Sequence, residues 1–335
     1  MEIKRIVIHE IQKEKGVNEA NLNLSESLTD VTDNVTFLSE RLSDAFKKDE
    51  KVIRTEFIEE EDVFQIAINS FLNDKNDETF YEFTELAIKD LRKRLMSSTL
   101  ATGGYFVFLN YETQNTEYIG VYIVRDTEEV IFNRSVDAGI FTVNKTTVIN
   151  TSKLAMACRV DLNKLVAGQK RYLHFTHRQT EISDYFVNWI EARLANKSKD
   201  DTESLIKIIN NIDRPIDPET NEEFEEDKFR TKIFDYINSI GRTVRVQDIG
   251  RNFWNDPDKI VDFAEENDYD INTEFQAVPS ILKRLKKYEV KSGKIKLSFS
   301  HNDYNLGIIG VGDDNQVVIN STEIRKQVDK LFEEQ

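Results

Sequence analysis

The run KRLKKYEVKSGKIK, residues 283–296, concentrates positive charge in a way that favours binding to phosphates. This basic segment holds seven Lys or Arg side chains against the single acid Glu289. On a helix followed by a strand these side chains can share one face and neutralise a nucleic-acid backbone. A solvated face that binds nothing is an equally open interpretation. The predicted DNA-binding residues of the segment are Lys283, Arg284, Lys286, Lys287, Lys291, Lys294 and Lys296.

Two further groups of cations lie in the amino-terminal part of the chain. Residues 164–178 interleave cations with aromatic side chains, which can stack on bases or simply anchor strands. We predict DNA contacts there for Lys170, Arg171 and Arg178, with Lys164 nearby. The other group lies on an expected helix and comprises Lys89, Arg92, Lys93 and Arg94.

Two short helices expected at residues 247–254 and 258–266, joined by a turn, have the order of a helix-turn-helix. A recognition helix should offer cations or amides to the major groove. The second helix instead carries Asp262, Glu265 and Glu266, which phosphates would repel. We therefore interpret the pair as packing around Phe253, Trp254, Ile260 and Phe263.

Signatures of catalysis are absent from the sequence, which has no Walker phosphate loop, Gly-x-Ser-x-Gly elbow or His-Glu-x-x-His helix. His174 and His177 form a close pair to which Glu181 and Asp184 could add ligands, but a hydrogen-bonding role suits two histidines at a strand end better. We expect no metal site and no cofactor. A metal-dependent nuclease built on one of the many acidic clusters stays an alternative, which plasmid incubated with Mg²⁺ or Mn²⁺ would test.

The overall charge opposes DNA binding at long range. The 335 residues include 45 Lys and Arg against 61 Asp and Glu, a formal net charge of −16. Screening limits charge effects to about 8 Å at physiological salt, so a local basic surface can outweigh the total. The sequence lacks an apolar run long enough to span a membrane and a signal-peptide pattern, and its single cysteine, Cys158, cannot form an internal disulfide. These features predict a cytoplasmic protein.

Hydrophobic periodicity predicts an α+β chain. We expect an amino-terminal domain of residues 1–195 with an antiparallel sheet and flanking helices, a polar, acidic connection at 196–227, and a smaller helix-rich domain with a small β element at 228–335. Strands are expected near residues 3–11, 20–28, 105–111, 118–124, 146–150, 156–162, 172–175, 293–299 and 315–320. Helices are expected near residues 30–48, 61–73, 77–97, 179–194, 203–211, 222–239, 247–254, 257–267, 279–288 and 322–333.

Several blocks of the sequence resemble the bacterial nucleoid-associated protein NdpA family (YejK-like), and the order of the elements before and after them agrees too, so the resemblance covers essentially the whole chain. The resemblance rests on the order and spacing of INTSKLAMACRVDL (149–162), KRYLHFTHR (170–178) and ISDYFVNWI (182–190), with TGGYFVFLNY (102–111) similar to a Gly-Gly strand start in that family. It implies an acidic, DNA-associated component of the nucleoid and implies no catalytic residues. The matching positions are Arg159, Asp161, Leu162, Arg171, Tyr172, Leu173, Phe175, Asp184, Tyr185 and Phe186.

Three functions follow as hypotheses. The first is a nucleoid-associated protein that binds double-stranded DNA without sequence preference through a local basic surface, as a homodimer whose two copies double that surface. The second is an acidic adaptor or DNA mimic that docks on a DNA-handling protein such as a topoisomerase. The third is the nuclease, acting in phage or plasmid conflict.

Overall fold

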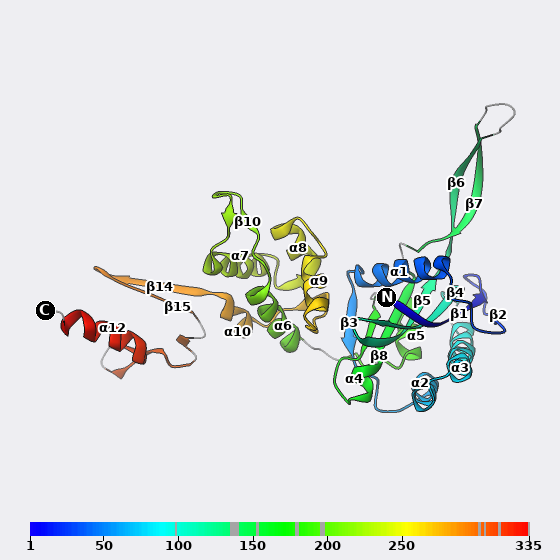
Figure 1. Ribbon diagram of the computed structural model, residues 1–335, viewed down its shortest axis with the longest axis horizontal. Helices are drawn as coiled ribbons and strands as arrows, with labels where there is room; N and C mark the ends of the chain where they lie inside the picture. The colour runs from blue at the N-terminus through cyan, green and yellow to red at the C-terminus, as the bar shows by residue number, and fades with distance from the viewer. Residues whose placement is uncertain are drawn as a thin grey trace. The chain divides into compact units, whose positions relative to one another are not determined.

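The computed structural model describes residues 1–97, 99–134, 141–151, 154–177, 181–194, 198–300, 303–304, 306–313 and 316–333. Contacts between Cα atoms divide the chain into two compact units, Met1–Asn196 and Lys197–Gln335 (Figure 1). Each unit combines helices with antiparallel strands, so the chain has a mixed α+β fold.

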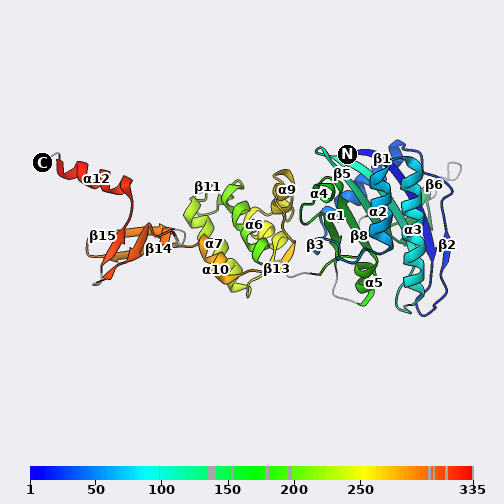
Figure 2. The same ribbon diagram turned by 90° about the horizontal axis from the view of Figure 1, so that it is seen from below.

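A seven-stranded sheet forms the centre of the first unit (Figure 2). Every neighbouring pair in it is antiparallel, in the order β2-β1-β4-β5-β8-β9-β3. The strands are β1 (Glu2–Gln12), β2 (Asn21–Asn23), β3 (Val52–Thr55), β4 (Gly104–Thr113), β5 (Thr116–Val124), β8 (Met156–Asp161) and β9 (Leu173–Thr176).

Helices bury both faces of this sheet. On β4, Phe106 and Phe108 belong to one hydrophobic cluster, whereas Val107 and Leu109 belong to the other, because successive side chains of a strand point to opposite faces. The first cluster packs against α2, α3 and α5, and the second packs against α1 (Figure 1). These helices are α1 (Asp33–Lys47), α2 (Val63–Asn73), α3 (Asp77–Met96) and α5 (Glu181–Trp189), and a short α4 (Leu162–Val166) follows β8.

The hairpin expected from residues 105–111 and 118–124 is confirmed as β4 and β5, and Gln114 and Asn115 form its turn with positive φ angles. Strand β3 has only four residues and was not expected from the pattern. Helix α5 ends at Trp189, earlier than the expected 194, because Glu191 takes a left-handed backbone conformation with φ 54°.

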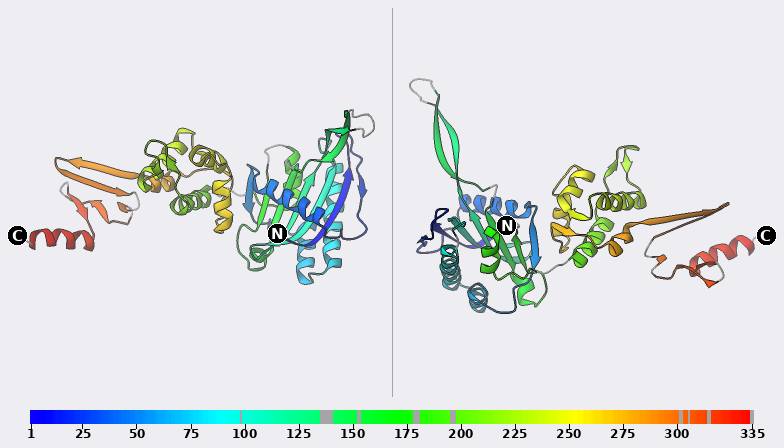
Figure 3. Two further views of the ribbon diagram at one scale, coloured as in Figure 1. Left: turned by 45° about the horizontal axis from the view of Figure 1, so that its top comes forward. Right: turned by 180° about the vertical axis from the view of Figure 1, so that it is seen from behind.

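Strands β6 (Asp126–Arg134) and β7 (Phe141–Ile149) form a two-stranded arm that leaves the sheet at the ends of β5 and β8 (Figure 3). Their register places Phe132 opposite Val143. The sequence predicts a strand only at 146–150, since the alternation in β6 is obscured by its charged residues.

The second unit has a helical core of its own. Its helices are α6 (Ser198–Asn211), α7 (Glu226–Ser239), α8 (Val246–Trp254), α9 (Lys259–Glu266) and α10 (Pro279–Leu282), and its first strands are β10 (Ile216–Asp217), β11 (Glu222–Glu223), β12 (Thr243–Arg245) and β13 (Glu274–Gln276). Residues 196–227, expected to be a polar, acidic connection, contribute Leu205, Ile208 and Phe224 to this core. The sequence predicts a helix near 203–211 but not the burial of its apolar side chains, because acidic residues dominate the stretch.

The carboxy-terminal part adds two hairpins and a helix. A 3₁₀ turn, η1 (Lys283–Leu285), leads into β14 (Lys287–Ser292), which pairs with β15 (Ile295–Ser300). Strands β16 (Ile309–Val311) and β17 (Val317–Ile319) form the other hairpin. The closing helix α12 (Thr322–Glu333) has the bounds expected from the sequence.

Candidate nucleic-acid interface

The basic segment, residues 283–296, is mainly a β-hairpin and not the helix followed by a strand that its sequence suggests. The expected helix 279–288 ends as α10 at Leu282 and tightens into η1. Leu282 and Leu285 are buried in the second core, which fixes the chain at the base of the hairpin. Lys283 and Arg284 lie between these two leucines and are exposed.

Two lysines at the base of the hairpin are held by neighbours on α7. Lys287 forms an ion pair with Asp227, and this bond raises the pKa of the lysine. Lys286 Nζ lies 5.7 Å from the ring centroid of Phe234 and 5.6 Å from that of Tyr288, within cation–π range. Both cations therefore have a structural role in attaching the hairpin to α7.

Further along the hairpin, Lys291 and Lys296 stand opposite each other and share one carboxylate. Glu289 lies 3.2 Å from Lys291 Nζ and 2.8 Å from Lys296 Nζ. Hydrogen bonds from Lys296 and Lys291 lower the pKa of Glu289. One negative charge is thus distributed over two lysines, and the group keeps a net positive charge.

The turn of the hairpin places Lys294 next to Gly293, whose φ of 58° suits a two-residue connection. Lys294 is exposed. Among the described residues, Lys283, Arg284 and Lys294 have no ion-pair partner, in contrast to the other lysines of the strands. These three side chains are the cations of the basic segment that are available to a phosphate.

The two faces of the hairpin differ in chemistry. Alternation places the lysines at 287, 291 and 296 on one face with Glu289, and the apolar residues on the other. On the apolar face, Tyr288 stacks on Phe299 with ring centroids 5.6 Å apart. The lysines of the cationic face are held by Asp227 and Glu289, and the apolar side chains of the other face join the two strands.

The second predicted group, around 164–178, is not one exposed surface. Lys170 is exposed, whereas Arg171 is only 5% exposed and its backbone N–H donates to Glu56 Oε1 at 3.1 Å. Arg178 lies outside the described residues. Of the two predicted residues that the structure describes here, Lys170 lies at the surface and Arg171 does not.

His174 is buried near two cations, Arg54 and Arg159, which are buried too. Arg159 Nε donates to His174 Nδ1 at 3.1 Å, so that nitrogen is unprotonated, and Nε2 lies 2.9 Å from Arg171 O. Burial, followed by the charges of Arg159 and Arg54, holds the pKa of His174 well below its ordinary value. A neutral His174 on β9 therefore serves as a hydrogen-bond partner of Arg159 on β8. Nearby, His177 makes an edge contact with Phe175, with ring centroids 6.0 Å apart.

The third group, on α3, is largely occupied by local partners. Lys89 pairs with Glu85 at 2.8 Å, Arg92 Nε donates to Ala20 O at 2.7 Å, and Arg94 binds two carboxylates. Lys93 is exposed. This surface therefore offers less available charge than the basic segment.

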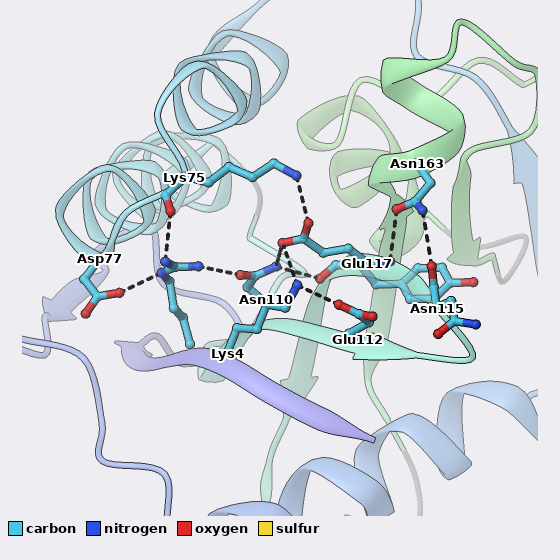
Figure 4. A network of polar contacts seen from close by, with 10 residues as sticks. Lys4, Lys75, Asp77, Asn110, Glu112, Asn115, Glu117 and Asn163 are labelled. Carbon is cyan, nitrogen blue, oxygen red and sulfur yellow. Dashed lines mark hydrogen bonds and ion pairs between the residues drawn. The ribbon is translucent and has the colours of Figure 1, made fainter.

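A polar network at the β4–β5 turn of the first unit is likewise balanced (Figure 4). Arg5 donates to Asp77 at 2.7 Å and to Asn110 at 2.9 Å, and Asn110 in turn donates to Glu117 at 2.9 Å. Lys75 pairs with Glu117 at 2.8 Å. Each cation faces a carboxylate, so the network fixes the α2–α3 connection to the sheet.

Helices α8 and α9 pack as the sequence suggests, with Ile260 buried and Phe253, Trp254 and Phe263 against the second core. Gly250 makes the tight turn possible, since a Cβ there would lie 2.4 Å from Asp256 O.

In the ranges that the structure describes, no three His, Cys, Asp or Glu side chains gather as metal ligands, and no helix is long and apolar enough to cross a membrane. Cys158 is buried, which raises the pKa of its thiol.

A family model and several curated proteins that match this chain agree on one family. A family model described as nucleoid-associated protein YejK matches residues 7–325. A nucleoid-associated protein of Pseudomonas entomophila (strain L48) is 24% identical over 309 residues, which cover 89% of each chain. Similar proteins from Pseudomonas putida (strain GB-1) and Aliivibrio salmonicida (strain LFI1238) are each 23% identical, over 89% and 67% of each chain.

Proposed function

We propose a DNA-binding function for this chain, which belongs to the nucleoid-associated protein family described as YejK. In this proposal the basic segment binds double-stranded DNA without sequence preference. The supporting observation is the set of three exposed cations, Lys283, Arg284 and Lys294, without ion-pair partners among the described residues of a chain whose net charge is −16. The family also supports a place at the nucleoid, in the cytoplasm.

We expect no sequence preference because of the kind of contact that the cations of the basic segment can make with DNA. Lysine is a flexible point charge that meets phosphates without reading bases. The only arginine of the segment, Arg284, stands on η1 and not on a helix suited to the major groove. Because the rest of the chain is acidic, binding should depend on these few contacts and on salt.

Reversing three charges tests the proposal. The triple variant Lys283→Glu, Arg284→Glu, Lys294→Glu should weaken retention of a double-stranded fragment on the order of a hundredfold at low salt. It should also reduce the slope of log affinity against log salt by about three, since roughly one unit is lost for each phosphate contact. Fluorescence anisotropy of a labelled duplex across a salt series measures both quantities.

The matched control reverses three exposed lysines of the same unit, in Lys199→Glu, Lys207→Glu, Lys326→Glu. It changes the net charge equally and should leave most of the affinity. Equal losses in the two variants would mean that only total charge matters and would remove the basic segment from the proposal. If wild-type protein retains no DNA but co-purifies with a topoisomerase or another DNA-handling protein, the acidic-adaptor hypothesis takes its place.

The homodimer is a further part of the proposal, and the β6–β7 arm supports it. Val130, Phe132, Phe141 and Val143 share one face of the arm and are 57–70% exposed. An isolated two-stranded hairpin is marginally stable in water, so an apolar cover from a second copy would stabilise it.

Light scattering should give about twice the 39.0 kDa of one chain for wild type. The double variant Phe132→Asp, Val143→Asp should give the monomer mass, and a dimer that survives it would exclude the arm.

A further inference from the structure

A pocket of about 780 Å³ opens in the second unit between the end of α8, the start of α9 and the chain around β10. The size is within the usual range for small-molecule sites. Its lining combines aromatic, amide and cationic side chains, with Asp213 as the single acid. The basic segment contributes no residue to it.

The aromatic wall is fixed in place by the core. Trp254 Nε1 donates to Asp213 O at 2.9 Å, which sets the orientation of the indole. Phe253 and Trp254 both make edge contacts with the buried Phe229, with ring centroids 5.9 and 5.4 Å away. Both lining rings remain partly exposed. They offer a planar ligand a rigid surface on which to stack.

The cations of the pocket outnumber its acid. Arg214, Lys232, Arg251 and Lys259 reach the lining. Arg251 pairs with Asp248 at 2.5 Å and Arg214 makes a longer contact with Glu223 at 3.4 Å. Lys259 has no ion-pair partner among the described residues, so its charge is open to an anion.

Two amides complete the lining, Asn252 and Asn255. Asn255 ends α8 in a left-handed conformation with φ 56° and lines the pocket directly after Trp254. Amide groups donate and accept hydrogen bonds, as the edges of nucleobases require.

We propose that this pocket binds a nucleotide, either free or as one unit of a single strand. The base stacks on Trp254 and Phe253, the amides meet its edge, and Lys259 with Arg251 holds the phosphate. An acidic peptide would use the cations but would leave the flat aromatic wall and the amides without matching groups. The site is independent of the proposed duplex contacts at 283–296, because bases inside a duplex cannot reach a pocket of this kind.

Tryptophan fluorescence gives a direct test, because the chain has two tryptophans and Trp189 is fully buried in the first unit. In the full-length Trp189→Phe variant, Trp254 is the only reporter. Titration with AMP and with short oligo(dA) should quench it saturably. Quenching by AMP identifies a free nucleotide as ligand, and quenching by oligo(dA) alone identifies a single strand.

Lys259→Ala should weaken binding about tenfold through loss of one charge-assisted contact, and the exposed Lys207→Ala on α6 should leave it unchanged. Equilibrium dialysis of labelled AMP or oligo(dA) against Trp254→Leu should show loss of binding without use of fluorescence. Absence of saturable quenching by both probes would overturn the proposal. Competition by polyglutamate as strong as that by the nucleotide would also overturn it, since the pocket would then be a peptide site.

Discussion

Gly103→Ala is expected to destabilise the first unit by about 4 kcal/mol or more, because the new side chain would overlap the backbone of a neighbouring segment. A Cβ at this position would lie 1.8 Å from Ile11 O and 2.7 Å from Lys13 N. Both are backbone atoms of the β1 end, so no side-chain rotation can relieve the contact. The Gly103 N–H also donates to Lys13 O at 3.0 Å, and this bond would be lost as the two chains separate.

The unfolding of the first unit can be followed separately in a Trp254→Phe background, where Trp189 is the only tryptophan. Urea titration of its fluorescence should show a much lower midpoint for Gly103→Ala. Gly168→Ala is the control, because Gly168 also lies in the first unit but nothing stands within 4 Å of its Cβ position. Its φ of 64° should cost only about 1 kcal/mol. Similar midpoints for the two variants would contradict the steric explanation.

The sheet and its helices could largely be predicted because their signals are local. Alternation in residues 105–111 and 118–124 is visible in the sequence, and the turn residues between them complete the hairpin. Strand β3 could not be predicted, since four residues carry little periodicity and its pairing with β9 is distant in the chain. Strand β6 was missed because Asp126, Glu128 and Glu129 mask its pattern.

The availability of the cations in the basic segment could not be predicted from the sequence. All seven look equally able to bind a phosphate, but whether each one is free depends on partners that only the fold supplies. Lys287 is engaged by Asp227 of α7, a residue 60 positions away. Arg171 looks like a surface cation in the sequence and lies in the interior. The aromatic pocket could not be predicted as a site, because its lining comes from separate stretches between residues 213 and 259, and the sequence indicates only core packing for Phe253 and Trp254.

The N-terminus of α2 is also capped by a residue that is distant in the chain, Glu191. Glu191 is 2% exposed. Its carboxylate accepts hydrogen bonds from the backbone N–H groups of Phe64 at 2.8 Å, Asp62 at 3.1 Å and Gln65 at 3.3 Å. The residue at the usual capping position, Asp62, makes no side-chain cap of its own. The helix start therefore depends on an acid supplied from the turn after α5.

Glu191→Ala should cost about 3–5 kcal/mol, because it leaves buried donors without an acceptor and removes a negative charge from a helix N-terminus. Glu191→Gln keeps one acceptor oxygen and the side-chain volume, so an intermediate loss is expected. The measurement is again the urea midpoint reported by the fluorescence of Trp189. This residue packs against Phe64 of α2, with ring centroids 5.1 Å apart.

Glu60→Ala separates the cap from a general effect of acidic residues near the helix start. Glu60 lies close to the same helix start but is exposed, so its removal should change stability by less than about 0.5 kcal/mol. If Glu191→Ala were no worse than Glu60→Ala, water would have to satisfy the three donors, and α2 would not depend on Glu191. The expected order of stability is instead Glu60→Ala above Glu191→Gln above Glu191→Ala, because it follows the number of acceptor oxygens left at the buried helix end.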